Sequence, residues 1–185
     1  MNKTLLLSTL LALAAGEAVA QGGMSDEERM QRVERLLAAT NPLEAGDSVW
    51  IEELTYIEVR DRVAGGATTA IISTGGIEEN GPYLATGKHN YIMKGVCPAL
   101  ARALGNALCA PIVGFVPDGN LDPPSGAMVF PGTFGVRTET YEMLLEDIAT
   151  SLKLDGFTDI AMIGDSGGNQ RGMKAVADRL NERWA

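Results

Sequence analysis

Apolar and polar positions follow one repeating order along the central part of the chain: an apolar run, a polar loop rich in glycine, and then an amphipathic stretch. The apolar runs predict β-strands over residues 68–73, 107–116 and 158–163. The amphipathic stretches predict helices over residues 91–104, 139–154 and 169–183. Because strands that alternate with helices favour parallel pairing, the pattern predicts an α/β fold whose mostly parallel sheet is covered by helices.

A further helix is expected before this core. Ser25 followed by Glu28 is a capping-box start, which predicts a helix that runs to about residue 39. The pair Asn41-Pro42 ends it, because the residue before a proline is disfavoured in a helix. Residues 50–63 then place apolar side chains at near-helical spacing.

The first twenty residues have the form of a secretory signal. Lys3 gives a positive start, residues 5–15 are apolar, and Ala18-Val19-Ala20 is a small-x-small site, so we expect cleavage before Gln21. The apolar run is too short for a membrane span of about 20 residues, and no later stretch approaches that length. We therefore expect an exported protein, periplasmic or secreted, that is soluble after cleavage. An uncleaved N-terminal anchor is the alternative.

The length of the chain predicts its domain organisation, and its net charge excludes one class of partner. We expect a signal peptide over residues 1–20, a leader and helix over residues 21–47, and a single α/β domain over residues 48–185, a length that suits one core. The chain has 24 acidic and 15 basic residues, which gives a formal net charge of -9. An acidic surface repels phosphate backbones, so nucleic acid is excluded as an expected partner.

Cys97 and Cys109 are the only cysteines of the chain. An exported protein can oxidise them, but both lie in apolar surroundings that also suit free buried thiols. The sequence leaves both alternatives open.

Candidate chemistry gathers in the loops that follow the predicted strands. In open α/β sheets, ligands bind in the crevice beyond the carboxyl ends of the strands. This rule points to residues 74–90, 117–133 and 164–169. The middle loop combines Asp118-Gly119-Asn120 with several prolines and glycines, a composition that suits the wall of a pocket.

The first loop contains an acid, amides, a cation and the only histidine of the chain. These residues are Glu78, Asn80, Lys88, His89 and Asn90. Such a set is unusual in a loop that only connects two elements, so we predict a functional role for Glu78 and His89. The alternative is a solvated turn whose polar side chains bond to the backbone.

The third loop, Gly164-Asp165-Ser166-Gly167-Gly168-Asn169, joins a predicted strand to a predicted helix. Free amide groups at the start of the helix can face an anion or a carbonyl oxygen, whereas a plain capping turn is the alternative. The sequence of this loop also resembles the sequence around the nucleophile of chymotrypsin-like proteases. Those proteases are β-barrels, whereas this loop joins a strand to a helix, so we do not expect a chymotrypsin-like fold. A convergent triad of Ser166, His89 and Glu78 stays a hypothesis.

Taken together, the loops resemble the creatininase (creatinine amidohydrolase) family. The family shows Glu-x-His-Gly-Pro-His-Leu-Pro, then Asp, Pro-Gly-Thr and Asn-Gly-His-Gly-Gly-Asn. In the same order this chain has Glu78-Glu79-Asn80-Gly81-Pro82-Tyr83-Leu84, Phe130-Pro131-Gly132-Thr133 and Gly167-Gly168-Asn169, after a similar opening over residues 50–55. The resemblance implies a three-layer αβα sandwich, a homo-oligomer, and hydrolysis of small cyclic or linear amides with one or two divalent metals. The chain ends before the C-terminal region of the family, so a C-terminal truncation is left open.

The sequence departs from the metal ligands of the family. Asn80 stands at the first family histidine, His89 at the ligand aspartate, and Ser166 at the histidine before Gly-Gly-Asn. A rearranged site of Glu78, His89 and Asp165 with a fourth water ligand suits zinc, manganese or iron. The alternative is a metal-free pocket in which Glu78 and His89 act as an acid/base pair or bind a ligand.

The resemblance predicts a metal-assisted hydrolase that acts on a C–N amide bond of a small molecule. The predicted catalytic residues are Glu78, His89 and Ser166, and the predicted metal ligands are Glu78, His89 and Asp165. The residues predicted to bind substrate are Asn80, Tyr83, Lys88, Asn90, Gly167, Gly168 and Asn169. The alternative is a non-catalytic member that binds a small molecule and has lost the metal site.

Overall fold

The computed structural model describes residues 23–44 and 46–185, so the predicted signal over residues 1–20 lies outside the described part of the chain. Contacts between residues divide the chain into two compact units, Met1–Pro42 and Leu43–Ala185. The candidate chemistry lies in the second unit.

Within the described residues of the first unit, the chain forms helix α2, Asp26–Leu37. The Ser25 hydroxyl accepts a hydrogen bond from the Glu28 N–H, and the Glu28 carboxylate accepts one from the Ser25 N–H at 2.8 Å. The predicted capping box is therefore confirmed. No side chain of α2 is buried, so capping and local pairs support this helix more than core packing does.

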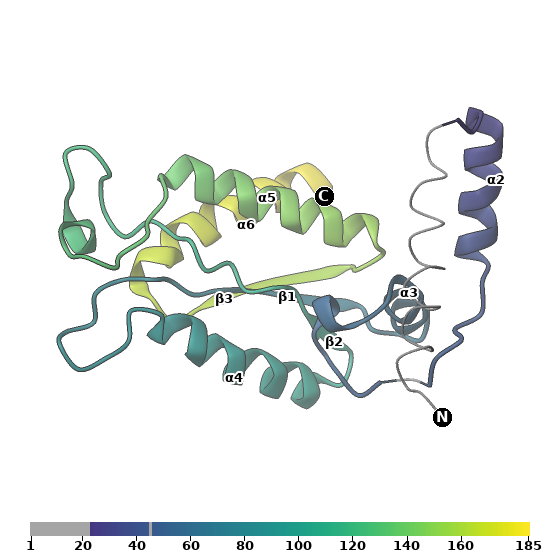
Figure 1. Cartoon of the computed structure of the whole chain (residues 1–185), viewed down its shortest axis with the longest axis horizontal. Coiled ribbons are helices and arrows are strands. Elements are labelled where there is room, and N and C mark those ends of the chain that lie inside the picture. The colour runs from purple at the N-terminus through teal and green to yellow at the C-terminus, as the bar shows by residue number, and fades with distance from the viewer. Residues whose placement is uncertain (1–22, 45) are drawn as a thin grey trace, which may run out of the picture. The chain divides into compact units, whose positions relative to one another are not determined.

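The second unit is built around a three-stranded sheet of order β2-β1-β3. The strands are β1 Thr69–Thr74, β2 Ala107–Cys109 and β3 Asp159–Gly164. Both pairings are parallel, and Ile71 in the centre lies opposite Cys109 on one side and Ala161 on the other. Because the strands run in one direction, the loops that follow them emerge at one end of the sheet (Figure 1).

Helices cover both faces of this sheet. Figure 1 shows α4 on one face and α5 together with α6 on the other. Their bounds are α4 Lys88–Leu104, α5 Thr138–Leu154 and α6 Gln170–Trp184, and α3 Tyr56–Ala64 precedes the sheet. Short 3-10 turns are η1 Ile51–Glu53, η2 Gly126–Val129 and η3 Gly167–Asn169. The predicted α/β fold with a parallel sheet between helical layers is confirmed.

None of the helices in the described residues combines the length and the apolar character that a membrane crossing requires.

Apolar side chains from the sheet and from the inner helix faces form one core. Ile71 and Ile72 of β1, Tyr141 and Leu145 of α5, and Val176 of α6 are fully buried in the same cluster. Burial of a large apolar side chain stabilises a fold by about 1.5–3 kcal/mol. The core therefore fixes the strand ends, and these position the loops.

A disulfide joins Cys97 of α4 to Cys109 of β2. Both residues are completely buried. Of the two alternatives that the sequence leaves open, the structure has the bridge, which ties α4 to the edge strand of the sheet.

Two predicted boundaries are wrong for physical reasons. The strand predicted over residues 107–116 ends at Cys109. After it, the Ala110 N–H still donates to the carbonyl oxygen of Ile71, and Val113 bridges Thr74. Pro111 lies between these points and has no N–H to donate to a strand ladder. Helix α4 begins at Lys88, before its predicted start at residue 91, so His89 lies in a helix. Its N-cap makes no side-chain hydrogen bond, so no polar capping residue marks this start in the sequence.

Candidate active site

The ring of His89 lies between two carboxylates. Its Nε2 is 2.8 Å from Oε1 of Glu78, in the loop between β1 and α4, and its Nδ1 is 2.8 Å from Oδ2 of Asp165, in the loop after β3. His89 itself occupies the first turn of α4 and is only 6% exposed. The structure thus brings together the three residues on which the sequence prediction is centred.

This arrangement constrains the protons of the ring. A carboxylate accepts hydrogen bonds, so a ring nitrogen that carries a proton donates to the carboxylate that it faces. The geometry therefore holds the ring between two acceptors, one at each nitrogen. The side chains of Glu78 and Asp165 are 21% and 25% exposed, so both carboxylates still reach the surface.

The Pro131-Gly132-Thr133 motif holds the loop that carries Glu78. The Glu79 N–H donates to Oγ1 of Thr133 at 3.2 Å, and the Phe134 N–H donates to the carbonyl oxygen of Ile77 at 2.9 Å. Within its own loop, the Glu78 N–H donates to the carbonyl oxygen of Thr86. These bonds on both sides of Glu78 fix the direction in which its carboxylate leaves the backbone.

The side chains of Asn90 and Asn169 form hydrogen bonds with the end of β1 and the first residues of the loop after it. Oδ1 of Asn90 accepts a hydrogen bond from the Gly76 N–H at 3.0 Å. Asn169 is fully buried, and its Nδ2 donates to the carbonyl oxygen of Gly75 at 2.8 Å and to Oγ1 of Thr74 at 3.1 Å. The Asn90 amide thus ties α4 to the loop after β1, and the Asn169 amide ties η3 to the end of β1. Both asparagines are predicted substrate-binding residues, and those roles stay predictions.

The remaining predicted binding residues lie around this centre. The Asn80 Nδ2 donates to the carbonyl oxygen of Glu78, so its amide is part of the loop turn. Tyr83 is 95% exposed at the loop tip, and Lys88 is partly buried at the start of α4. Gly167 and Gly168 are exposed in η3, at the approach to α6. Their predicted roles in binding stay predictions.

Ser166 does not complete a triad in this arrangement. A serine nucleophile needs a ring nitrogen of the histidine as its base. Both ring nitrogens of His89 already face Glu78 and Asp165 at 2.8 Å. The geometry therefore does not support the convergent serine triad of the sequence analysis.

The three predicted metal ligands do not converge on one point. Glu78 faces Nε2 of His89 and Asp165 faces Nδ1, and these nitrogens lie on opposite sides of the ring. Because an ion binds one nitrogen of a histidine, one ion cannot take all three side chains as ligands here. Across residues 23–44 and 46–185, no group of three His, Cys, Asp or Glu side chains is placed to hold a metal. The residues fit a hydrogen-bonded relay and do not fit the predicted single-ion site.

Asp118 is an acidic residue of this region that the sequence analysis treated only as part of a pocket wall. Burial, together with the nearby negative charge of Glu78, raises the pKa of Asp118 to about 6, although His89 acts in the opposite direction. Its Oδ2 is buried and has no hydrogen-bond partner among the described residues. Its position at the head of the loop after β2 was visible in the sequence, but the direction of its side chain was not.

A groove lies beside this centre. Its volume is about 580 Å³, and the residues that line it include Ile77, Thr86, Asn90, Tyr91 and Lys94. Ile77 directly precedes Glu78, and Asn90 directly follows His89. The groove therefore borders the two segments that carry Glu78 and His89.

The chain has a recognisable family match. The family model for creatinine amidohydrolase, called Creatininase, matches residues 52–185. A search of curated proteins finds no match.

Solved structures show the same fold. The chain is similar to a crystal structure of creatinine amidohydrolase (creatininase), with a TM-score of 0.63 and 23% identity over 76% of this chain and 55% of that chain. It is also similar to a mutant creatininase of the Zn-Zn type, with a TM-score of 0.62 and 23% identity over 76% and 55% of the two chains. The chain is similar as well to a third structure, creatininase Mn, with a TM-score of 0.62 and 23% identity over 75% of this chain and 55% of that chain. The chain thus spans about 55% of the length of these proteins.

Proposed function

Because this chain belongs to the creatininase family, we propose that it is a hydrolase that cleaves a carbon–nitrogen amide bond, cyclic or linear, in a small molecule. The observation that carries the proposal is the buried ring of His89, held at 2.8 Å from Glu78 and from Asp165 beyond the carboxyl ends of β1 and β3. Amide hydrolysis needs a positioned base that activates water. This unit contains such a base and the groups that orient it.

Glu78 is the base in this mechanism. Its side chain is partly exposed and one carboxylate oxygen, Oε1, faces His89, so we assign the other oxygen to the attacking water. As the water oxygen attacks the carbonyl carbon, Glu78 takes one of its protons. A positioned base of this kind contributes about 10²- to 10⁴-fold to the rate.

His89 and Asp165 position that base. Asp165 accepts the hydrogen bond from Nδ1 and fixes the ring, so that the Nε2–H is directed at Glu78. The exposed amides of Gly167 and Gly168 are the donors that we assign to the carbonyl oxygen as it becomes negative.

The groove beside the site suits the part of the substrate that does not react. Ile77 and Tyr91 give it apolar surface, while Asn90 and Lys94 add polar groups. Such a mixture, with a volume of about 580 Å³, is typical of sites for small organic molecules.

The test is hydrolysis of a panel of small cyclic and linear amides by the purified protein, with release of the amine as the readout. We expect turnover by the wild type and a loss of about 10²-fold or more in kcat for Glu78→Gln. Glu79→Gln is the matched control, because it makes the same change on the adjacent residue and should keep activity. Equal rates for the two variants, or no turnover of any amide by the wild type, would rule out this mechanism.

A second candidate function is binding of a small molecule without catalysis. It is favoured by Asn80 and Ser166, which replace imidazoles of the family motif with neutral groups. A ligand that binds only the folded state raises its stability by mass action. A compound from the panel that raises the Tm but is recovered unchanged would favour this candidate over hydrolysis.

We also propose that the protein works after export. The basic start, the apolar run and the small-x-small site within residues 1–20 support this proposal. The Cys97–Cys109 disulfide supports it as well, because such bonds persist in oxidising compartments. N-terminal sequencing of the protein from an exported fraction should begin at Gln21. Full-length protein retained in the cytoplasm would contradict the proposal.

A further inference from the structure

Asp118 lies where the loop after β2 passes between the other two loops of the site. The carbonyl oxygen of Pro117 lies so close to Gly168 that a Cβ added there would be 3.3 Å from it. A Cβ added at Gly76 would meet the side chain of Val116 at 3.3 Å and Cδ2 of His89 at 3.8 Å. The segment that carries Asp118 is therefore packed against both the β1 loop and the β3 loop.

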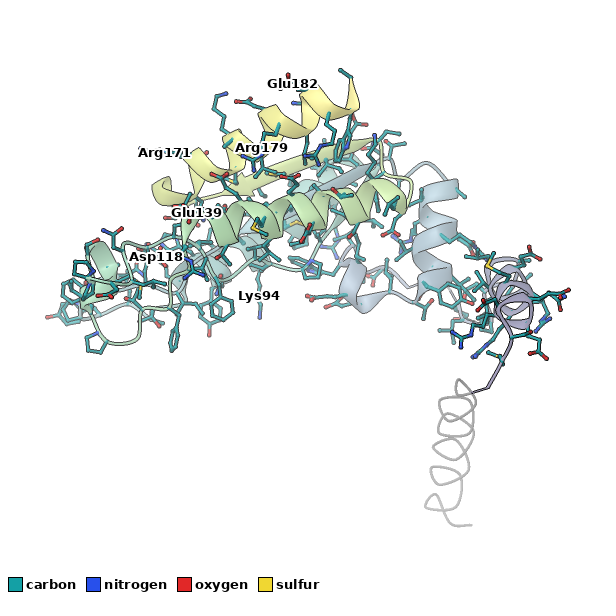
Figure 2. The ribbon with its side chains drawn as sticks, turned by 90° about the horizontal axis from the view of Figure 1, so that it is seen from above. Lys94, Asp118, Glu139, Arg171, Arg179 and Glu182 are labelled. Carbon is teal, nitrogen blue, oxygen red and sulfur yellow. A yellow bond between two sulfur atoms is a disulfide. The ribbon has the colours of Figure 1, made fainter. Side chains whose placement is uncertain are left out.

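The backbone on each side of Asp118 is fixed. The carbonyl oxygen of Asp118 accepts a hydrogen bond from the Ala127 N–H at 3.0 Å, and the carbonyl oxygen of Val116 accepts one from the Val136 N–H at 3.1 Å. Figure 2 shows Asp118 among the side chains of the loop region. These two bonds hold the backbone that carries the Asp118 side chain between the β1 loop and the β3 loop.

One oxygen of the Asp118 carboxyl group, Oδ2, has no hydrogen-bond partner among the described residues. Glu78 and Asp165 each bond to a ring nitrogen of His89, whereas Oδ2 of Asp118 is buried and makes no hydrogen bond among the described residues. The charged groups that act on it are Glu78, from the β1 loop, and His89, from α4. Burial and the charge of Glu78 raise its pKa to about 6, so it keeps a proton at a pH where an ordinary aspartate has lost it.

We propose that Asp118 is a further catalytic residue, which gives its proton to the departing nitrogen when the amide C–N bond breaks. The inference rests on the proposed function. It assigns opposite tasks to two neighbouring carboxyl groups whose surroundings differ, with Glu78 as the base and Asp118 as the acid.

The step balances. Glu78 takes one proton from the attacking water, and the water oxygen forms a bond to the carbonyl carbon. When the C–N bond breaks, its electron pair goes to the nitrogen, which takes the proton of Asp118. The products are a carboxylic acid and an amine. Transfer of the proton from Glu78 to Asp118 through solvent then restores both groups.

The kinetic test compares Asp118→Asn with Asp122→Asn, an exposed aspartate of the same loop. Each protein is assayed on an alkyl amide and on the matching 4-nitroanilide, whose departing nitrogen is much less basic and therefore depends less on a proton from an acid. We expect Asp118→Asn to lose about 10²-fold or more in kcat on the alkyl amide and far less on the nitroanilide. The wild-type rate on the alkyl amide should also fall as the pH rises through about 6, and this fall should be absent in Asp118→Asn.

The outcomes separate the two claims. Equal losses on both substrates, with an active wild type, would overturn the role of Asp118 and leave the proposed function intact. A wild type that hydrolyses neither substrate would overturn the proposed function, and the acid role with it.

A second measurement does not depend on activity. Carboxyl ¹³C NMR of the aspartate-labelled protein, assigned with Asp118→Asn, follows the titration of Asp118 directly. We expect a midpoint near 6 in the wild type and a lower midpoint in Glu78→Gln, because that variant removes the neighbouring negative charge. A midpoint at the ordinary value for aspartate in both proteins would overturn the inference whatever the kinetics show.

Discussion

At the scale of single residues, Gly75 and Asn90 lie so close together that no side chain fits between them. A Cβ built on Gly75 would lie 1.9 Å from Oδ1 of Asn90 and 3.1 Å from its Cα. We expect Gly75→Ala to lower the free energy of unfolding by about 1–3 kcal/mol, since overpacking forces side chains and backbone to shift. Urea denaturation measures this change.

The matched control is Gly95→Ala on the same helix as Asn90. Nothing lies within 4 Å of a Cβ at Gly95. Because alanine favours a helix interior over glycine, this variant should gain up to about 1 kcal/mol. Similar losses in Gly75→Ala and Gly95→Ala would show that the contact with Asn90 is not the cause.

Asp118 also makes a prediction for stability against pH. Its pKa in the folded protein is about 6, above the ordinary value of 3.8, so folding favours its protonated form. The contribution of protonated Asp118 to the free energy of unfolding is fully present below about pH 4 and is lost as the pH rises through about 6. Asparagine does not titrate, so Asp118→Asn should gain stability relative to the wild type between pH 4 and pH 7, as measured by urea denaturation. A difference that does not change with pH would contradict the assignment.

At the scale of elements, sequence periodicity predicts the helices and the two longer strands well. The predicted strands over residues 68–73 and 158–163 correspond to β1 and β3, displaced by one residue. β2 is the exception, because the apolar run continues beyond Cys109 while Pro111 interrupts the hydrogen-bonding ladder. A pattern of apolar residues reports burial, and it does not report which backbone groups are paired.

The predicted elements account for only part of the candidate site. The meeting of Glu78, His89 and Asp165 follows from their places beside the ends of parallel strands. Which ring nitrogen each carboxylate meets depends on the rotation of the α4 start, which no capping residue marks. The direction of Asp118 depends on distant partners, Ala127 and Val136, and no local pattern contains them.

The disulfide gives a prediction about the pairing of two elements. It links α4 to β2 across a sequence separation of 12 residues. A bridge over such a loop stabilises by about 2–4 kcal/mol, mainly because it restricts the unfolded chain. We therefore expect a reductant to lower the midpoint of urea unfolding. The double variant Cys97→Ala/Cys109→Ala should already unfold at lower urea and should not respond to reductant. A wild type with the same midpoint in both conditions would contradict the bridge.

At the scale of the whole molecule, this chain has the fold of the creatininase family, but the polar residues near its strand ends differ from those of the family motif. The resemblance places an aspartate where this chain has His89, and a glycine and a histidine where it has Asp165 and Ser166. The imidazole of His89, in the first turn of α4, and the carboxylate of Asp165, in the loop after β3, meet at the same end of the sheet. The scaffold sets where such groups gather, and the individual side chains set what they do there.

The most direct test of this account uses the fact that His89 is the only histidine of the chain. In untagged protein, a ¹⁵N NMR spectrum of the imidazole reports the state of both ring nitrogens without any need for assignment. The account predicts an N–H on both nitrogens, and loss of the Nδ1 hydrogen bond in Asp165→Ala, with no change when zinc or manganese is added. A ring with one bare nitrogen that shifts or broadens on addition of metal would contradict the relay and restore His89 as a metal ligand.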